Sequence, residues 1–227
     1  MKPTDEQAGA WTKAFNEGNF VRKSSEFRDQ ITAQGPFDAQ TGRYHLYLSH
    51  ACPWAHRTLI VRNLLGLADH ITTDVVDWRM NQDGSWSFNP DEEGATEDSI
   101  NGEDNLEGVY ARAFDGWKES GRIGTVPVLW DRQHSTIVNN ESREIIRMFD
   151  VLALSGLGNG TSLCPEPLKE EIDAMIDANY EAVNNGVYKS GFARTQDAYD
   201  EAVTNLFARL DELENHMTNR EWLVGSG

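Results

Sequence analysis

Residues 49–53 (SHACP) join a strand pattern to a helix pattern, and this junction constrains the fold more than any other feature. Residues 43–48 alternate between inward and outward side chains, which predicts a strand. Apolar residues then recur at helical spacing over 54–65, the preceding proline suits a first helical position, and Gly66 supplies a stop. A second strand pattern follows over 71–78. Strand, helix and strand in this order predict a βαβ unit.

The rest of the chain continues as an α/β part and then a helical part. Residues 79–104 are rich in Asp, Glu, Asn and Gly and predict a long loop, and loops of this length are usually functional. The next predicted elements are a helix over 106–117, strands over 125–130 and 136–138, and a helix over 142–150. The Gly-rich stretch 154–165 has no periodicity and predicts a domain linker. Two helices are predicted beyond it, over 169–183 and over 196–217 with Thr195 as N-cap.

The composition of the 227 residues is strongly acidic, with a formal net charge of −17, a pI near 4.6, and six Lys against fourteen Arg. This balance argues against partners that need a basic surface, namely nucleic acid and acidic membranes. Because the acidic residues are spread along the chain, they are expected to coat a folded surface. We interpret this charge as an adaptation to a salty cytoplasm, where ions would screen the repulsion between the acidic residues; an ordinary acidic cytosolic protein is the alternative.

The chain has no membrane-length apolar run and no signal-peptide pattern, so we expect a soluble cytoplasmic protein.

The two cysteines, Cys52 and Cys164, are too few for a disulfide scaffold and favour a reducing compartment. Cys52 precedes the predicted helix, where unpaired N–H groups and the helix dipole favour the thiolate. Ala55 stands where a Cys-x-x-Cys motif needs its second cysteine, so Cys52 would form a mixed disulfide with a small thiol and be released by another. A buried, inert cysteine is one alternative. A metal site with His50 and His56 is another, but it lacks further ligands at suitable spacing.

Two other positions suggest contacts with a small peptide. A proline inside the predicted strand 125–130 favours a cis Val126–Pro127 bond. The backbone of Val126 would then be available to pair with a bound peptide. The alternative is a proline on an edge strand. Glu141 and Ser142 open a helix directly after a strand. The N–H groups and the Ser142 hydroxyl there can hold a carboxylate, and Glu141 can accept an ammonium. A γ-glutamyl group carries both charges, although a plain helix cap fits these two residues equally well.

The stretches that identify a family are 44–65 (YHLYLSHACPWAHRTLIVRNLL), 83–88 (DGSWSF), 125–131 (TVPVLWD), 137–142 (IVNNES) and 185–193 (NGVYKSGFA). Together they resemble the glutathionyl-hydroquinone reductases, the Xi-class branch of the glutathione transferases, over most of residues 40–215. Residues 1–40 are polar, with irregularly scattered aromatics, and predict an N-terminal extension. The resemblance implies an α/β thioredoxin-like, thiol-binding domain over 41–153. The linker 154–165 would then lead to an all-α substrate domain over 166–227 that is incomplete relative to the family.

The resemblance also implies roles for seven residues. Cys52 would be the nucleophile and Tyr188 would face the aromatic substrate and help to stabilise the departing hydroquinone. The residues that would hold glutathione are Trp86, Val126, Pro127, Glu141 and Ser142.

The implied activity is the reduction of glutathionyl-hydroquinones through a Cys52–glutathione mixed disulfide. The cosubstrate would be glutathione, or γ-glutamylcysteine if the source is salt-adapted. No metal or nucleotide is expected, since phosphate-binding loops are absent. The alternatives are an omega-like thiol transferase or dehydroascorbate reductase, a non-catalytic binding protein, and an inactive fragment. The Xi branch forms dimers, and the sequence leaves open whether this chain forms a homodimer.

Overall fold

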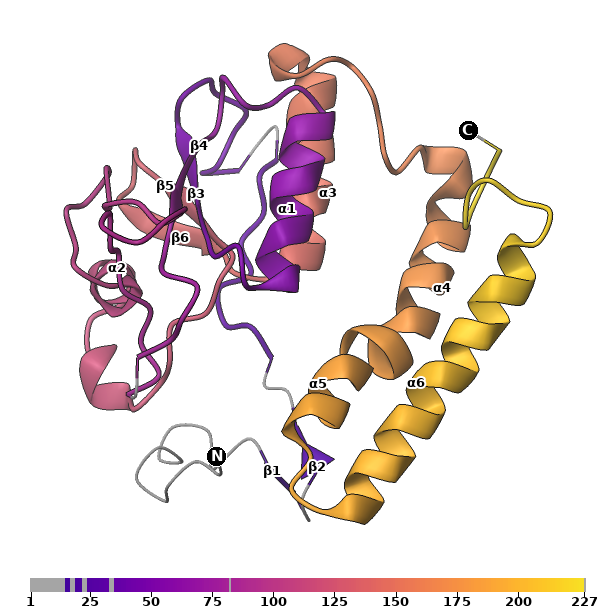
Figure 1. Ribbon diagram of the computed structural model, residues 1–227. Coiled ribbons are helices and arrows are strands. Elements are labelled where there is room, and N and C mark those ends of the chain that lie inside the picture. Colours follow the sequence, from indigo (N-terminus) through magenta and orange to yellow (C-terminus); the bar gives the residue numbers. More distant parts are fainter. Residues whose placement is uncertain (1–14, 17–18, 22–23, 33–34, 82, 227) are drawn as a thin grey trace. The chain divides into compact units, whose positions relative to one another are not determined.

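The computed structural model describes residues 15–16, 19–21, 24–32, 35–81 and 83–226, which form two compact units (Figure 1). The first unit contains Ser25–Leu163. The second contains the residues from Cys164 onward, together with the described part of Trp11–Ser24. Each unit is considered by itself below. Much of the predicted extension 1–40, including residues 1–14, lies outside the described residues.

A mixed four-stranded sheet forms the centre of the first unit, in the order β4-β3-β5-β6. The strands are β3 (Tyr44–Leu48), β4 (Thr72–Val75), β5 (Val128–Asp131) and β6 (Thr136–Asn139). Strand β3 runs parallel to β4 and antiparallel to β5, which pairs antiparallel with β6. The central strands β3 and β5 are buried along their whole length, as expected for strands covered on both faces. The predicted βαβ unit and the thioredoxin-like fold class are confirmed.

Three helices cover this sheet. Helices α1 (Pro53–Leu64) and α3 (Ser142–Leu152) lie side by side on one face, and α2 (Leu106–Ala113) lies on the other (Figure 1). The core between these layers includes Leu46, Ala55, Leu129, Ile145 and Phe149, which are fully buried. Because α1 and α3 pack together, their N-terminal ends can contribute to one site.

Three elements of the first unit are clearly shorter than the sequence predicts. The strand predicted over 71–78 is limited to β4 (Thr72–Val75). The helix predicted over 106–117 ends at the end of α2, because Phe114 adopts an extended backbone and Gly116 takes a positive φ of 80°. The strand predicted over 125–130 begins only after Pro127, because proline has no N–H to donate to the ladder.

The predicted long loop 79–104 is confirmed: its described residues contain no helix and no strand, only an isolated bridge at its centre. Buried carboxylates hold the end of this loop on the sheet. Asp74 accepts hydrogen bonds from the N–H and the hydroxyl of Ser99, at 2.7 and 2.8 Å. Tyr47 donates to Asp98 at 2.8 Å. These bonds let a long insertion remain ordered.

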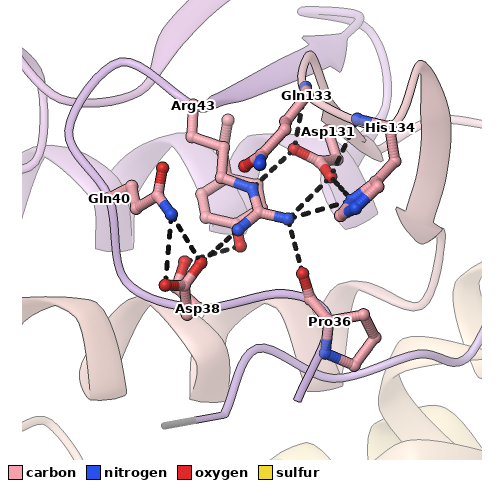
Figure 2. Close-up of polar contacts among 8 residues, drawn as sticks. Pro36, Asp38, Gln40, Arg43, Asp131, Gln133 and His134 are labelled. Carbon is pink, nitrogen blue, oxygen red and sulfur yellow. Dashed lines mark hydrogen bonds and ion pairs between the residues drawn. The ribbon is translucent and has the colours of Figure 1, made fainter. Parts of the chain in front are cut away.

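A buried ion pair joins the start of β3 to the β5–β6 hairpin (Figure 2). The Arg43 guanidinium donates to both carboxylate oxygens of Asp131, at 2.7 and 2.9 Å, and both side chains are almost completely buried. Arg43 also donates hydrogen bonds to the carboxylate of Asp38 and to the carbonyl oxygen of Pro36, the latter at 2.7 Å. His134 contacts the same carboxylate at 2.6 Å. The cluster therefore fixes residues 36–38 against the sheet.

Helices dominate the second unit (Figure 1). They are α4 (Lys169–Asn179), α5 (Gly186–Phe192) and α6 (Gln196–Met217), with a π-helical turn over Tyr180–Asn184 between α4 and α5. The predicted Thr195 cap of α6 is confirmed, since its hydroxyl accepts from the N–H of Ala198 at 3.3 Å. No helix within the described ranges is both long and apolar enough to cross a bilayer.

Three elements of this unit were not predicted from the sequence. Helix α5 contains two glycines and only three aromatic or aliphatic side chains, and it shows no helical periodicity of its own. The two-residue strands β1 (Phe15–Asn16) and β2 (Asn19–Phe20) pair antiparallel and are too short to give a pattern.

Candidate functional site

Cys52 occupies the N-cap position of α1, and Pro53 follows as the first helical residue, as predicted. The Cys52 carbonyl accepts the first helical hydrogen bond from His56 at 2.9 Å, and its N–H donates to Ser49 at 3.1 Å. The first turn of α1 contains no acidic residue. The half-buried sulfur therefore lies at the positive end of the helix dipole, an environment that favours a thiolate.

The Val126–Pro127 peptide bond is cis, as predicted, and directly precedes β5. The carbonyl oxygen of Val126 lies 3.6 Å from the Cys52 sulfur, which donates to it in the thiol form. Both Val126 and Pro127 are buried. The backbone predicted to pair with a bound peptide is thus next to the predicted nucleophile.

Glu141 and Ser142 open helix α3, as predicted, with Glu141 as the N-cap. The Glu141 carboxylate accepts from the N–H of Arg143 at 3.2 Å and from the Ser25 hydroxyl at 3.0 Å, so the residue does cap the helix. The Glu141 side chain keeps 14% of its surface exposed, whereas Ser142 is only 1% exposed. Glu141 therefore faces solvent more than Ser142 does, which the sequence did not predict.

Arg57 of α1 reaches the start of α3 and was not identified from the sequence. Its Nε and Nη2 atoms donate to the Ser142 hydroxyl at 3.0 and 2.6 Å, and Nη2 lies 3.7 Å from the Glu141 carboxylate. The guanidinium lies 4.8 Å from the centre of the Trp54 ring, a cation–π distance. The sequence did contain one indication of the contact with Trp54: Arg57 follows Trp54 by three residues, a spacing that places both side chains on one helix face. Its pairing with Ser142 depends on how α1 and α3 pack.

Tyr110 links the segment before Val126 to the segment before Glu141. Its hydroxyl donates to the carbonyl of Thr125 at 2.8 Å and accepts from the Thr125 N–H at 3.2 Å. It also accepts from the Asn140 amide at 3.0 Å. Burial raises the pKa of Tyr110 to about 12, so the hydroxyl keeps its proton near neutral pH. Tyr110 thereby sets the spacing of two predicted site segments.

We expect Tyr110→Phe to lower the free energy of unfolding by about 1–3 kcal/mol, because it removes the acceptor that the Thr125 N–H and the buried Asn140 amide share. The ring, and therefore its packing, is retained. Urea unfolding at pH 7 measures the change. Tyr199→Phe is the matched control, since Tyr199 is 45% exposed and its loss should change the free energy by less than about 0.5 kcal/mol. Equal effects of the two substitutions would contradict this role of Tyr110.

Trp86 lies in loop 79–104, half-buried against the core of the first unit. Its carbonyl accepts from the N–H of Leu106 at 2.8 Å, which ties the loop to the start of α2. The turn before it is closed by Asp83, which accepts from the N–H and hydroxyl of Ser85 at 2.9 and 2.7 Å. The Ser85 hydroxyl and N–H hold the pKa of Asp83 below its ordinary value. The backbone of Trp86 is therefore fixed on both sides.

Tyr188 belongs to the second unit, whereas the other predicted site residues belong to the first. It lies in α5, half-buried, and its ring stacks on Phe20 with centroids 5.9 Å apart. Phe192 completes the cluster, at 5.9 Å from Tyr188 and 5.5 Å from Phe20. The role of Tyr188 toward an aromatic substrate stays a prediction.

The first unit thus brings together a helix-capping thiol, the cis Val126–Pro127 bond and an acidic helix cap with an adjacent arginine. Its described residues include no group of three or more His, Cys, Asp or Glu arranged to hold a metal ion. The arrangement is suited to holding a small thiol peptide by its backbone and its charged end while its sulfur meets Cys52.

Known proteins resemble this chain in sequence and structure. A family profile described as glutathione S-transferase, N-terminal domain, matches residues 51–152. Glutathionyl-hydroquinone reductase PcpF of Sphingobium chlorophenolicum is 46% identical, over 96% of this chain and 69% of its own length. Glutathionyl-hydroquinone reductase YqjG of Escherichia coli is 45% identical, over 92% of this chain and 65% of its own length. The chain therefore spans about two thirds of the length of these curated relatives.

Two solved structures agree with these matches. The glutathione-S-transferase Xi from Phanerochaete chrysosporium superposes with a TM-score of 0.85 at 45% identity, covering 93% of this chain and 68% of that one. The glutathione-bound structure of YqjG superposes with a TM-score of 0.80 at 44% identity, covering 88% of this chain and 66% of that one.

Proposed function

Because this chain belongs to the Xi-class glutathione transferases, the family of the glutathionyl-hydroquinone reductases, we propose that it reduces glutathionyl-hydroquinones to hydroquinones at the expense of glutathione. One observation carries the proposal. Cys52 caps helix α1 next to the Val126 carbonyl, and Ala55 removes any possibility of an internal disulfide at that helix start. A sulfur in this position is a nucleophile that must exchange with an external thiol.

The proposed reaction begins when the Cys52 thiolate attacks the sulfur of the glutathionyl group. The bond between this sulfur and the ring carbon breaks, and the ring carbon keeps the electron pair and takes up a proton. Hydroquinone leaves, and a Cys52–glutathione mixed disulfide remains. A second glutathione thiolate attacks this disulfide, which releases glutathione disulfide and restores the Cys52 thiolate. The net reaction consumes one glutathione for each substrate molecule.

The other residues position the substrate in this proposal. The Val126 backbone beside Pro127 pairs with the backbone of the cysteinyl residue of glutathione, as an added strand does. Glu141 and Ser142 hold the γ-glutamyl end, and Trp86 packs against the peptide from the loop. Tyr188 faces the ring and stabilises the departing hydroquinone. γ-Glutamylcysteine has the same γ-glutamyl and thiol groups, so these residues would recognise it as well.

The test measures the release of hydroquinone from a purified glutathionyl-hydroquinone in the presence of excess glutathione. The reaction is run in low salt and in molar salt, and chromatography quantifies the product. We expect stoichiometric hydroquinone and glutathione disulfide. Dehydroascorbate and a glutathione mixed disulfide are tested in parallel. If only these two are reduced, the protein is an omega-like thiol transferase. If none of the three reacts, the proposed reductase activity is wrong for this chain.

A further inference from the structure

The β1–β2 hairpin of the second unit brings an aromatic ring onto helix α5. Strand β2 ends at Phe20 and contacts α5, beside which it is drawn in Figure 1. The Phe20 ring stacks on the Tyr188 ring, with centroids 5.9 Å apart and an angle of 25° between the ring planes. Phe20 is only 5% exposed, whereas Tyr188 is half-buried. Phe20 therefore supports Tyr188 from within the unit, and part of Tyr188 remains exposed.

Helix α5 by itself gives Tyr188 little support. The helix has seven residues, too few for an isolated helix to be stable, and two of them are Gly186 and Gly191. Gly186 is buried and lies against Leu206 of α6. Tyr188 follows two residues later, about 200° further around the helix. The stacking with Phe20 thus holds the side of α5 opposite to the one that packs on α6.

Phe192 completes the aromatic cluster but cannot replace Phe20. It follows Tyr188 by four residues, so both rings lie on one face of α5 and move with that helix. Its ring centre is 5.9 Å from that of Tyr188 and 5.5 Å from that of Phe20, and it is 48% exposed. Phe20 is the member of this cluster that comes from another element. It can therefore fix the Tyr188 ring relative to the rest of the unit.

The direction of the Tyr188 hydroxyl follows the rotamer of its ring, and a hydrogen bond weakens steeply when it is poorly aligned. We propose that Phe20 is a positioning residue, which holds the Tyr188 ring in the rotamer from which its hydroxyl reaches an oxygen of the departing hydroquinone. This inference rests on the proposed function, because it explains how Tyr188 is oriented for the same reaction. It gives the hairpin before the first unit a part in catalysis.

The two halves of the proposed reaction separate this role from general stabilisation. The first half transfers the glutathionyl group to Cys52 and releases hydroquinone, so it uses Tyr188. The second half removes the group with glutathione and involves no hydroquinone. Rapid quenching and mass spectrometry of the Cys52 adduct measure each half in a single turnover. We expect Phe20→Ala to slow the first half by about 3- to 10-fold, the contribution of one aromatic pair, and to leave the second unchanged.

Tyr188→Phe completes a double-mutant cycle. It keeps the ring but removes the hydroxyl, and should slow the first half by about 10- to 100-fold, the range for a hydrogen bond to a charged group. Adding Phe20→Ala to Tyr188→Phe should slow it by less than about 2-fold more, because no hydroxyl is left to orient. Val21→Ala is the matched control, since Val21 directly follows Phe20 and is 47% exposed. Both of its rates should equal those of wild type.

The outcomes separate the two proposals. If Phe20→Ala slows the first half equally with and without the Tyr188 hydroxyl, or slows both halves alike, the positioning role of Phe20 is wrong and the proposed function stands. If Tyr188→Phe keeps the wild-type rate, the hydroxyl has no role and Phe20 has none through it, although the reductase activity stands. If wild type releases no hydroquinone, both proposals are wrong.

Thermal unfolding is recorded for every variant, because truncating a buried ring can prevent folding. If Phe20→Ala does not fold, Phe20→Leu decides the question by the same comparisons, since leucine keeps an apolar side chain there but not the planar ring. Equal slowing of the two halves in Phe20→Leu, or equal slowing with and without the Tyr188 hydroxyl, would overturn the role of Phe20.

Discussion

Replacing Cys52 with alanine is expected to lower the rate of hydroquinone release by at least about 1,000-fold, since losing a nucleophile removes the covalent step itself. Cys52→Ser should be equally inactive, because a serine hydroxyl stays protonated at a helix N-terminus near neutral pH. Neither change should affect folding strongly, because the sulfur is only half-buried. Chromatography of the released hydroquinone measures the rate.

The mixed disulfide gives an independent measurement of the same step. Wild type mixed with a glutathionyl-hydroquinone and no other thiol should gain the mass of one glutathionyl group at Cys52. Cys164→Ala is the control: Cys164 belongs to the second unit and the proposed nucleophile to the first, so its loss should leave both release and adduct unchanged. Release that survives in Cys52→Ala but not in Cys164→Ala would show that the wrong cysteine has been assigned.

Asp131→Ala is expected to lower the free energy of unfolding by about 3–5 kcal/mol, the usual result of removing one partner of a buried ion pair. The substitution removes the buried carboxylate from the Arg43 guanidinium, which keeps only its pair with the half-exposed Asp38 among its ion pairs in the described chain. It also removes the acceptor for the N–H groups of Gln133 and His134, at 3.1 and 3.3 Å. Urea unfolding at pH 7 measures the loss. Arg112→Ala is the control, because the Arg112–Glu103 pair is largely exposed and should contribute less than about 1 kcal/mol.

The effect of Asp131→Ala should depend on pH. Burial by itself raises the pKa of Asp131, but the hydrogen bonds from Arg43 and His134 outweigh it and hold the pKa below its ordinary value of 3.8. In acid the unfolded chain therefore binds a proton at Asp131 before the folded chain does, so this contribution to stability rises with pH. It is fully present above the unfolded pKa and is lost as the pH falls through the folded pKa. The difference between wild type and variant should shrink below about pH 4; a difference that stays constant from pH 7 to pH 2 would contradict the ion pair.

Much of the local structure was predictable because short stretches of chain determine it. The alternation at Tyr44–Leu48, the proline after Cys52 and the threonine before α6 each predict an element that the structure contains. The cis bond before Pro127 was predicted from a proline where a core strand was expected. The exceptions are also local. Helix α5 was missed because glycines interrupt its pattern, and α2 ends early at Phe114.

The family motifs predicted which residues to consider, but not how those residues are held. Glu141 and Ser142 were predicted as a pair that binds charged groups, whereas in the structure Ser142 is covered and bonded by Arg57. Tyr110, which joins the segments at Thr125 and Asn140, carried no signal in its own stretch of sequence.

The sequence by itself determined where helices α1, α3 and α6 begin, that one cysteine caps a helix, and that a cis proline follows Val126. Each of these depends on steric and hydrogen-bonding preferences of residues within a few positions of one another. Only the tertiary structure decided that Arg57 meets Ser142, 85 residues away, and that Arg43 meets Asp131, 88 residues away. These contacts form only when helices and strands from distant parts of the chain pack together, and no local preference encodes which side chains then become neighbours.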